Sequence, residues 1–209
     1  MAKSVEEICN LALQRVGVTQ TIDSIEQRVK EAMVCNACYD TVREKALKDA
    51  PFPFSRKYSL LARSGTDPIK WKYRYVYPND CLAIRYLFPT LDAAFTVSEI
   101  REVARRFKHP YEIAIDETGE KTILTDIEDA AIEYTANIDN PKRFDASFVS
   151  FLAWGVAGEI ALPLSRDIAF AQNAFTMYER EMNAAIAAAL NEETIDEQPE
   201  SEFVTTRLG

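Results

Sequence analysis

The chain has few of the residues on which most catalytic and cofactor sites depend. Its 209 residues include one histidine, His109, and six glycines, none of them in the spacing of a phosphate-binding loop. No Ser-His-Asp or Cys-His pattern surrounds His109, and the H-E-x-x-H pattern of metalloproteases is absent. We therefore expect no catalytic residues, no cofactor and no metal ion, and we predict that the protein is not an enzyme.

Cationic charge and long apolar runs are also scarce. The 24 Lys and Arg residues stand against 33 Asp and Glu residues, which gives a net charge of −9. Because binding to phosphates depends on cations, this deficit argues against general nucleic-acid affinity. No apolar run approaches the ~18 residues that a membrane helix needs, and residues 1–4 resemble no secretory signal. We expect a protein made and used in a cytoplasm, with no membrane contact.

The four cysteines form no complete metal or disulfide pattern. Cys35 and Cys38 are spaced as C-x-x-C, but neither Cys9 nor Cys81 has a Cys or His nearby to complete a zinc site. The C-x-x-C pair also falls in the middle of a predicted helix, away from the N-terminal position that lowers a thiol pKa. We expect reduced cysteines that pack as small core residues.

The first 51 residues have the pattern of two helices. A capping box that opens at Ser4 begins the first helix, and Gly17 ends it. A second capping box, at Ser24, predicts the start of the other helix, which Pro51 stops.

The middle of the chain changes to the alternation of β-strands. In residues 70–77 this alternation puts cations on one face and aromatics on the other, whereas an aromatic nucleic-acid platform needs both on one face. We therefore expect the aromatics of this segment to pack in the core. The predicted strands are residues 70–77, 81–88, 111–115, 121–125 and 131–136, while residues 96–109 fit either a strand or a short helix.

Helical spacing returns after Pro141. A helix capped by Asp145 is apolar nearly all round until Pro163 and Ser165 break it, and a last helix follows to Leu190. Because a surface helix needs only one apolar stripe, the first of these helices is predicted to contact neighbouring subunits. The predicted subunit-interface residues are Phe148, Phe151 and Trp154.

These patterns predict an α+β fold. Its form would be a four-helix bundle of two N-terminal and two C-terminal helices, with an inserted β-rich module and an extended C-terminal tail. The predicted divisions are an N-terminal helix pair (1–51), the β-rich module (52–140), a C-terminal helix pair that completes the bundle (141–190) and an acidic docking tail (191–209).

The tail has the most unusual pattern in the chain. Residues 191–202 carry six carboxylates and no cation, with too few apolar groups to fold alone. A solvated terminus normally stays polar, yet this one regains apolar residues at its end. We predict that it docks on a partner through Phe203, Val204, Arg207 and Leu208; a terminus without a role is the alternative.

Carboxylates gather at two predicted turns, Asp116, Glu117 and Glu120 at one and Asp126, Glu128 and Asp129 at the other. A glycosidase-type acid–base pair is one interpretation. Solvated turn charge is the other.

Several stretches, taken in order, resemble one protein family. The order and spacing of these stretches, together with the Glu-rich tail, resemble the head-to-tail adaptor (connector) proteins of tailed bacteriophages, the group that includes tail tubular protein A of short-tailed phages. None of the motifs is catalytic, so the resemblance implies an architecture and no site residues. The stretches are Ile8–Gly17, Ala32–Arg43, Leu47–Phe54, Trp71–Leu82, Thr122–Asp126 and Tyr134–Asp145.

The resemblance implies a structural virion protein at the head–tail junction. Such adaptors form a ring, typically of twelve copies, beneath the portal protein, and line the channel through which DNA is ejected without specific binding. The β-rich part would face the tail tube, nozzle or other tail protein below. Two other functions stay open: a carboxylate-dependent cell-wall hydrolase, and a small binding module that offers its C-terminal tail to a host protein.

Overall fold

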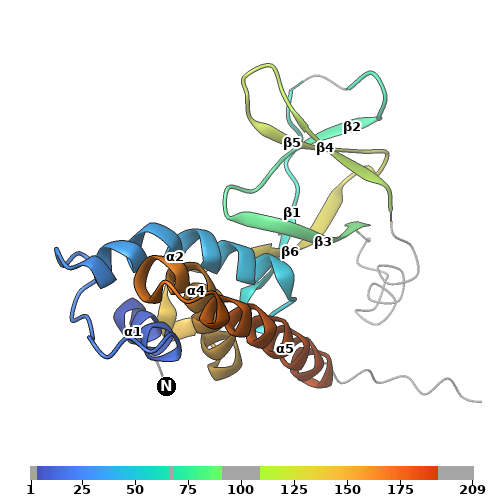
Figure 1. Ribbon diagram of the computed structural model, residues 1–209. Coiled ribbons are helices and arrows are strands. Elements are labelled where there is room, and N and C mark those ends of the chain that lie inside the picture. The colour runs from blue at the N-terminus through green and yellow to red at the C-terminus, as the bar shows by residue number, and fades with distance from the viewer. Residues whose placement is uncertain (1–3, 66–67, 91–108, 193–209) are drawn as a thin grey trace, which may run out of the picture.

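The computed structural model describes residues 4–65, 68–90 and 109–192 (Figure 1). Within these ranges the fold is mixed α+β, with four α-helices and two three-stranded antiparallel sheets. The helices are α1 (Val5–Arg15), α2 (Lys30–Asp49), α4 (Ala146–Ser165) and α5 (Ile168–Glu192). The strands are β1 (Arg56–Leu60), β2 (Tyr73–Val76), β3 (Cys81–Pro89), β4 (Tyr111–Ile115), β5 (Lys121–Thr125) and β6 (Ala130–Ala136).

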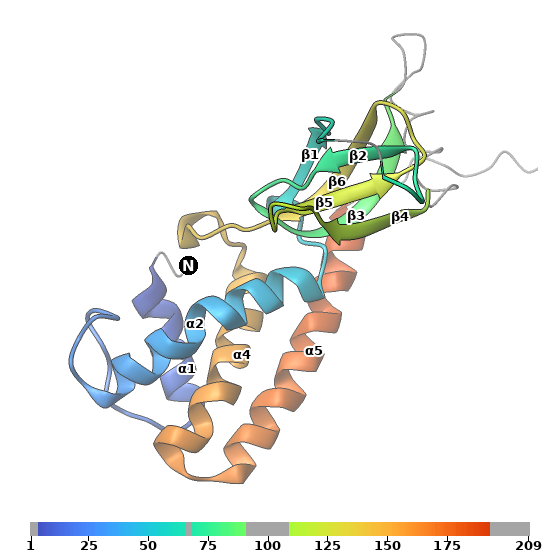
Figure 2. The same cartoon turned by 90° about the horizontal axis from the view of Figure 1, so that it is seen from above.

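The helices form one layer, in which α4 packs against α1, α2 and α5 (Figure 2). Phe148, Phe151 and Ile160 of α4 are fully buried. The apolarity of α4 on nearly all sides therefore has an explanation within a single chain, because three helices of that chain surround it.

Length and composition alone would allow α4 to cross a membrane. This corrects the expectation that no apolar run is long enough. In the most apolar window of α4, 61% of the residues are buried inside the protein. A buried core helix meets the same criterion, so the apolarity of α4 is weak evidence for a membrane span.

The predicted ends of α1 are confirmed, but the predicted start of α2 is wrong. The Ser4 side chain accepts a hydrogen bond from the backbone N–H of Glu7, and Gly17 follows the helix with a φ of 76°. At Ser24, by contrast, the side chain accepts from the N–H of Glu26 and the carbonyl accepts from the N–H of Gln27. These local bonds close a turn in place of a helix, and α2 begins only at Lys30.

The sequence predicted that Pro163 would break α4, but this helix continues past it. The helix continues to Ser165 and ends at Arg166, whose φ is 57°. A proline this close to the end of a helix removes one hydrogen bond and leaves few later ones to disturb. Asp167 then accepts from the backbone N–H of Ala169 at the start of α5.

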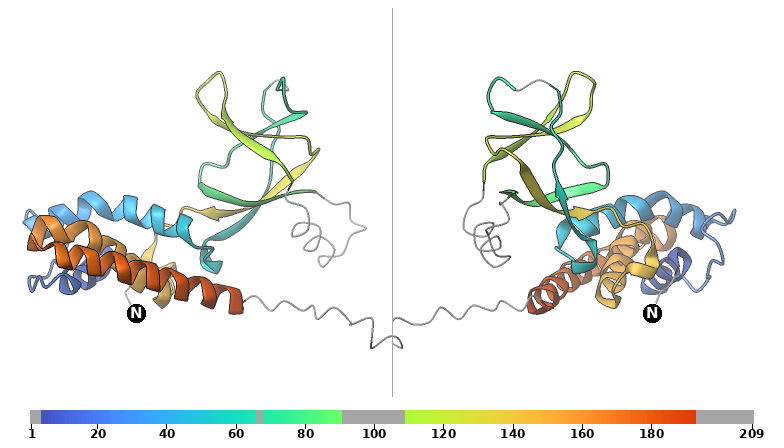
Figure 3. Two further views of the ribbon diagram at one scale, coloured as in Figure 1. Left: turned by 45° about the vertical axis from the view of Figure 1, so that its right-hand side comes forward. Right: turned by 180° about the vertical axis from the view of Figure 1, so that it is seen from behind.

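The strands form two sheets that lie beyond one end of the helices (Figure 3). The proximal sheet, named here for its contacts with α2, has the order β1-β6-β3, and the distal sheet has the order β2-β5-β4. The predicted strand at residues 70–77 is reduced to Tyr73–Val76, and β1 was not predicted. Two register shifts interrupt β3, so its residues do not alternate as predicted.

An aromatic cluster joins the helices to the chain segments that enter and leave the sheets. The rings of Phe52 and Phe148 lie 4.7 Å apart in an edge-on arrangement, and those of Phe151 and Tyr178 stack at 4.3 Å. Phe52 precedes a short 3-10 helix (Pro53–Ser55), and a second one (Pro141–Arg143) follows the last strand. The contact with Phe148 therefore buries Phe52 at the point where the chain passes from the helices into the strands.

Candidate docking surfaces

The joint between helices and sheets is built around Arg85 of β3. Its guanidinium donates to the backbone carbonyls of Leu47, Lys48 and Ala50 at 3.0–3.3 Å. The Nε atom donates to the Thr135 hydroxyl of β6 at 2.8 Å. The last carbonyls of a helix have no partner within it, and a cation at this end also complements the helix dipole. One side chain of the proximal sheet therefore caps the C-terminus of α2.

A second set of polar contacts fixes α2 to the segment that follows β6. Arg43 of α2 is buried and donates to the carbonyl of Ile138 at 3.2 Å. The Asn137 side chain donates to Glu44 at 3.2 Å. Polar groups that are paired in a site with little water are costly to separate. These contacts and those of Arg85 therefore fix the position of α2 relative to the proximal sheet.

A small hollow beside this joint does not have the size of a ligand site. Its volume is about 10 Å³, room for about one water molecule, whereas ligand pockets typically measure roughly 300–1,000 Å³. The Arg56 and Glu133 side chains that line it form an ion pair at 3.1 Å. Among the described residues, no group of three or more His, Cys, Asp and Glu could hold a metal ion.

Large apolar side chains are exposed at the other end of the helical layer. Leu162 of α4 is 52% exposed, and Ile168 and Phe175 of α5 are 64% and 50% exposed. The Phe175 ring lies against α4 beside Gly158, and Ile168 lies two turns away on the same side of α5. Exposed apolar groups that gather in this way are typical of contact surfaces.

The three predicted subunit-interface residues lie in two different environments. Phe148 and Phe151 are fully buried in the core of one chain, so they present no surface to a neighbouring copy. Trp154 is half-buried, and the guanidinium of Arg15 lies 4.1 Å from the centre of its ring. The prediction of a subunit contact therefore depends on Trp154 among these three.

Three of the six carboxylates in the two acidic turns have local structural partners. Asp126 accepts from the backbone N–H of Lys72, Glu128 accepts from Arg63 at 2.8 Å, and Asp116 accepts from both the N–H and the hydroxyl of Thr118. The hydrogen bond from the Thr118 side chain, followed by that from the Glu120 backbone, lowers the pKa of Asp116. A general acid would need a raised carboxyl pKa, so the geometry of this turn does not favour an acid role for Asp116.

The prediction that the aromatics of segment 70–77 pack in the core is confirmed at Tyr75, although the cation beside it in the strand, Arg74, is half-buried. Tyr75 is fully buried and donates its hydroxyl to the carbonyl of Ile127, whereas Lys72 is exposed. Outside the strand, Lys70 and the Trp71 indole both bond to Glu112 of β4 at 3.0–3.1 Å. Lys70 and Trp71 therefore share a partner within their own chain.

The cysteines are reduced, as expected. Cys9, Cys35 and Cys81 are buried and Cys38 is half-buried within α2. Burial raises the pKa of the Cys38 thiol to about 12, which makes this thiol unreactive at neutral pH.

Two groups of sequence predictions fall outside the described residues. They are the tail with its proposed docking residues Phe203, Val204, Arg207 and Leu208, and the ambiguous segment 96–109 except for His109. Sequence reasoning also missed two features that the structure reveals, the cap formed by Arg85 and the exposure of the predicted strand β4 at the edge of its sheet. A lone arginine in an otherwise apolar strand was the available signal for Arg85. Comparison with protein-family models and with curated proteins finds no match to this chain.

Proposed function

We propose that this chain is a structural head-to-tail adaptor of a tailed bacteriophage. In this proposal about twelve copies form a ring beneath the portal protein, join the head to the tail and line the channel for exiting DNA. The helices form a four-helix bundle that carries an inserted β-rich module, and the tail beyond residue 191 docks on the portal.

The observation that carries the proposal is the joint built by Arg85 and Arg43. These side chains bind backbone carbonyls on the far side of the helix–sheet boundary. An adaptor must pass force between two partners, and a joint of partly buried, hydrogen-bonded polar groups suits that role. The resemblance of the ordered sequence stretches to phage adaptors supplies the identity of the two partners.

The carboxylates support the adaptor over the cell-wall hydrolase. The hydrogen bond from Trp71, followed by the contact with Lys70, lowers the pKa of Glu112. Hydrogen bonds within its turn lower the pKa of Asp116. A glycosidase of the common type needs one carboxyl group that stays protonated while the other is ionised, and neither of these acids fits the protonated role.

Charge supports a channel through which DNA slides without sticking. Twelve copies at −9 each carry about −108 in total, and acidic groups on the channel wall would repel phosphates. At physiological salt the screening length is ~8 Å, so the repulsion acts only near the wall. We expect the acidic side of the ring to face the channel.

Removal of the tail tests the proposal directly. A chain truncated after Asn191 should keep its helix content and melting temperature, because it loses only the last residue of α5, which ends at Glu192. It should fail to attach stably to rings of the portal protein from the same phage. Circular dichroism and co-sedimentation with portal rings measure the two properties.

Two full-length variants show whether attachment depends on the apolar side chains of the tail or only on the presence of the tail. Phe203→Ser combined with Leu208→Ser should weaken attachment, whereas Thr205→Ala combined with Thr206→Ala should not. If the truncated chain joins portal rings as tightly as the native one, the tail is not the docking element. If the native chain does not bind the portal at all, the adaptor function itself is refuted.

A further inference from the structure

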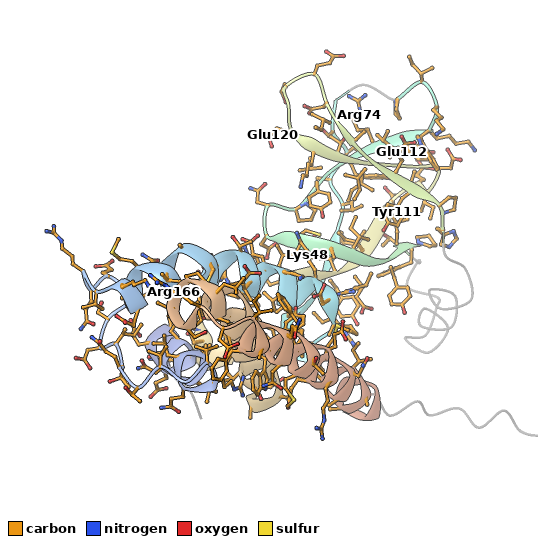
Figure 4. All side chains as sticks on the ribbon, in the orientation of Figure 1. Lys48, Arg74, Tyr111, Glu112, Glu120 and Arg166 are labelled. Carbon is orange, nitrogen blue, oxygen red and sulfur yellow. The ribbon has the colours of Figure 1, made fainter. Side chains whose placement is uncertain are left out.

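The β4 strand is an exposed edge with an unusually apolar sequence. Among the described residues it pairs only with β5, on the outside of the distal sheet (Figure 4). Tyr111, Ile113 and Ile115 are 36%, 49% and 70% exposed. Natural edge strands are usually protected by charges, proline or bulges, yet β4 carries a single charge, Glu112. That carboxylate is already held by Lys70 and Trp71 of its own chain.

The backbone of β4 turns alternate residues toward β5 and toward solvent. The N–H of Asp116 donates to the carbonyl of Glu120 at 2.9 Å, so these two facing residues form a hydrogen-bonded pair. Along two antiparallel strands, facing residues are hydrogen-bonded to each other at every second pair, and at the pairs between them the backbone groups point away from the partner strand. Glu112 and Ala114 therefore direct their backbone groups to β5, and Tyr111, Ile113 and Ile115 direct theirs outward.

These outward groups match a second copy of the same strand. If two β4 strands lie antiparallel with Ile113 facing Ile113 of the other copy, Tyr111 faces Ile115 at both ends. Each of these three pairs joins residues whose backbone groups point outward, which allows about six hydrogen bonds, two at each pair. In this register the two copies therefore bond only through backbone groups that β4 does not already use to bond β5.

The side chains agree with the same register. All three hydrogen-bonded pairs bring apolar side chains together, on the face that β4 shares with Tyr75 and Ile123. Glu112 faces Ala114 of the other copy, so the two carboxylates do not meet. Tyr111 and Glu112 lie on opposite faces of β4 (Figure 4), and the charge therefore stays away from the apolar contacts.

We propose that β4 is a self-pairing edge through which two copies of this chain form a two-fold dimer, joining their distal sheets into one six-stranded sheet. Strand addition of this kind is a common mode of recognition, and a two-fold axis makes the contact self-complementary. The two copies point in opposite directions, so this pairing belongs to the free protein and not to a single ring of parallel copies. It thus goes beyond the adaptor function and does not depend on it.

Cysteine cross-linking tests the register. In Ile113→Cys the two thiols face each other across the axis, with Cα atoms ~5.5 Å apart, within the range of roughly 4.4–6.8 Å for disulfides. In Ile115→Cys each thiol faces Tyr111, and the two thiols lie roughly 13 Å apart or more. A mild oxidant should therefore link two copies of the first variant by a disulfide and leave the second without a disulfide link. The native chain, treated in the same way, shows how much linking its own four cysteines cause.

A charge substitution tests whether the edge holds the native dimer. Ile113→Lys puts two cations opposite each other at the axis, and it should shift the monomer–dimer equilibrium measured by light scattering at least tenfold toward monomer. Val76→Lys is the matched control, because Val76 is 46% exposed and lies on the same sheet but on β2. The control should dimerise like the native chain, and melting curves show whether both variants are folded.

The outcomes separate this proposal from the adaptor function. A native chain that stays monomeric to millimolar concentration, or Ile113→Lys that dimerises as well as Val76→Lys, overturns the edge proposal. Cross-linking of Ile115→Cys as efficiently as Ile113→Cys overturns the register. None of these experiments contains the portal, so the result of the portal-binding assay stands independently of them.

Discussion

Asp80 connects three strands of the proximal sheet with one carboxylate. It lies in the turn before β3, accepts from Lys57 of β1, and accepts from the Tyr134 hydroxyl of β6 at 2.9 Å. Its backbone carbonyl also accepts from the N–H of Asn137 at 2.7 Å. Partial burial acts to raise the carboxyl pKa, but the hydrogen bonds from Lys57 and Tyr134 outweigh it and the pKa is lowered.

The lowered pKa of Asp80 predicts a pH-dependent contribution to stability. A carboxyl whose folded pKa lies below its unfolded pKa stabilises the protein above the unfolded value, near 3.8, and loses that effect as the pH falls through the folded value. Asp80→Asn should therefore cost more unfolding free energy at pH 7 than at pH 3. Urea titrations at both pH values measure this difference, and an equal cost at both would contradict the assignment.

The packing of α4 depends on two glycines that differ in their surroundings. A Cβ atom on Gly155 would lie 2.7 Å from Cγ1 of Val42 and 2.9 Å from Cε2 of Tyr178, both in the core. A Cβ atom on Gly158 would lie 3.3 Å from Cε1 of Phe175. Since Phe175 is 50% exposed, its ring has room to move and the Tyr178 ring does not.

Alanine substitutions at these two glycines should have different effects. Gly155→Ala overpacks the contact of α4 with α2 and α5, and it should destabilise the protein by about 1–3 kcal/mol. In Gly158→Ala the gain in helix propensity, up to about 1 kcal/mol, offsets a smaller clash. Urea unfolding measures both, and equal destabilisation would show that the contacts of Gly155 do not limit the packing.

For the whole molecule, Arg85 holds helices and sheets in one unit. Burial lowers the pKa of Arg85, but from an ordinary value so high that the guanidinium stays charged at neutral pH. Three carbonyls of the α2 C-terminus and the Thr135 hydroxyl share this one cation. Its removal would leave those carbonyls without a charged donor at the helix–sheet boundary.

Arg85→Met should destabilise the chain by about 2–3 kcal/mol, the cost of losing hydrogen bonds to a charged donor in a partly buried site. The exposed Arg166 supplies the matched control, Arg166→Met, which should change stability by less than about 0.5 kcal/mol. Urea unfolding followed at the tyrosines of the sheets and by helix ellipticity measures both parts. If Arg166→Met lowers the free energy of unfolding as much as Arg85→Met does, the contacts of Arg85 do not stabilise the boundary between helices and sheets.

Much of the local structure could be predicted, because short-range chemistry dominates it. The capping box at Ser4 and the hairpin of β4 and β5 follow from residues close in sequence, and both are confirmed. The start of α2 was wrong because Ser24 has equivalent local bonds in a turn. Strand β1 was missed because its exposed Tyr58 and Leu60 hide the alternation of a half-buried strand.

The sequence by itself determined the periods of the helices and strands and the acidic balance, since each depends on composition or on neighbours close in the chain. Only the tertiary structure decided what the apolar groups contact. It buried Phe148 and Phe151 inside one chain and left Ile113 and Ile115 on an open edge. It also brought Arg85 to the end of α2. The hydrophobic effect has no direction of its own, so the same apolar pattern can serve a core or a contact surface, and the fold determines which.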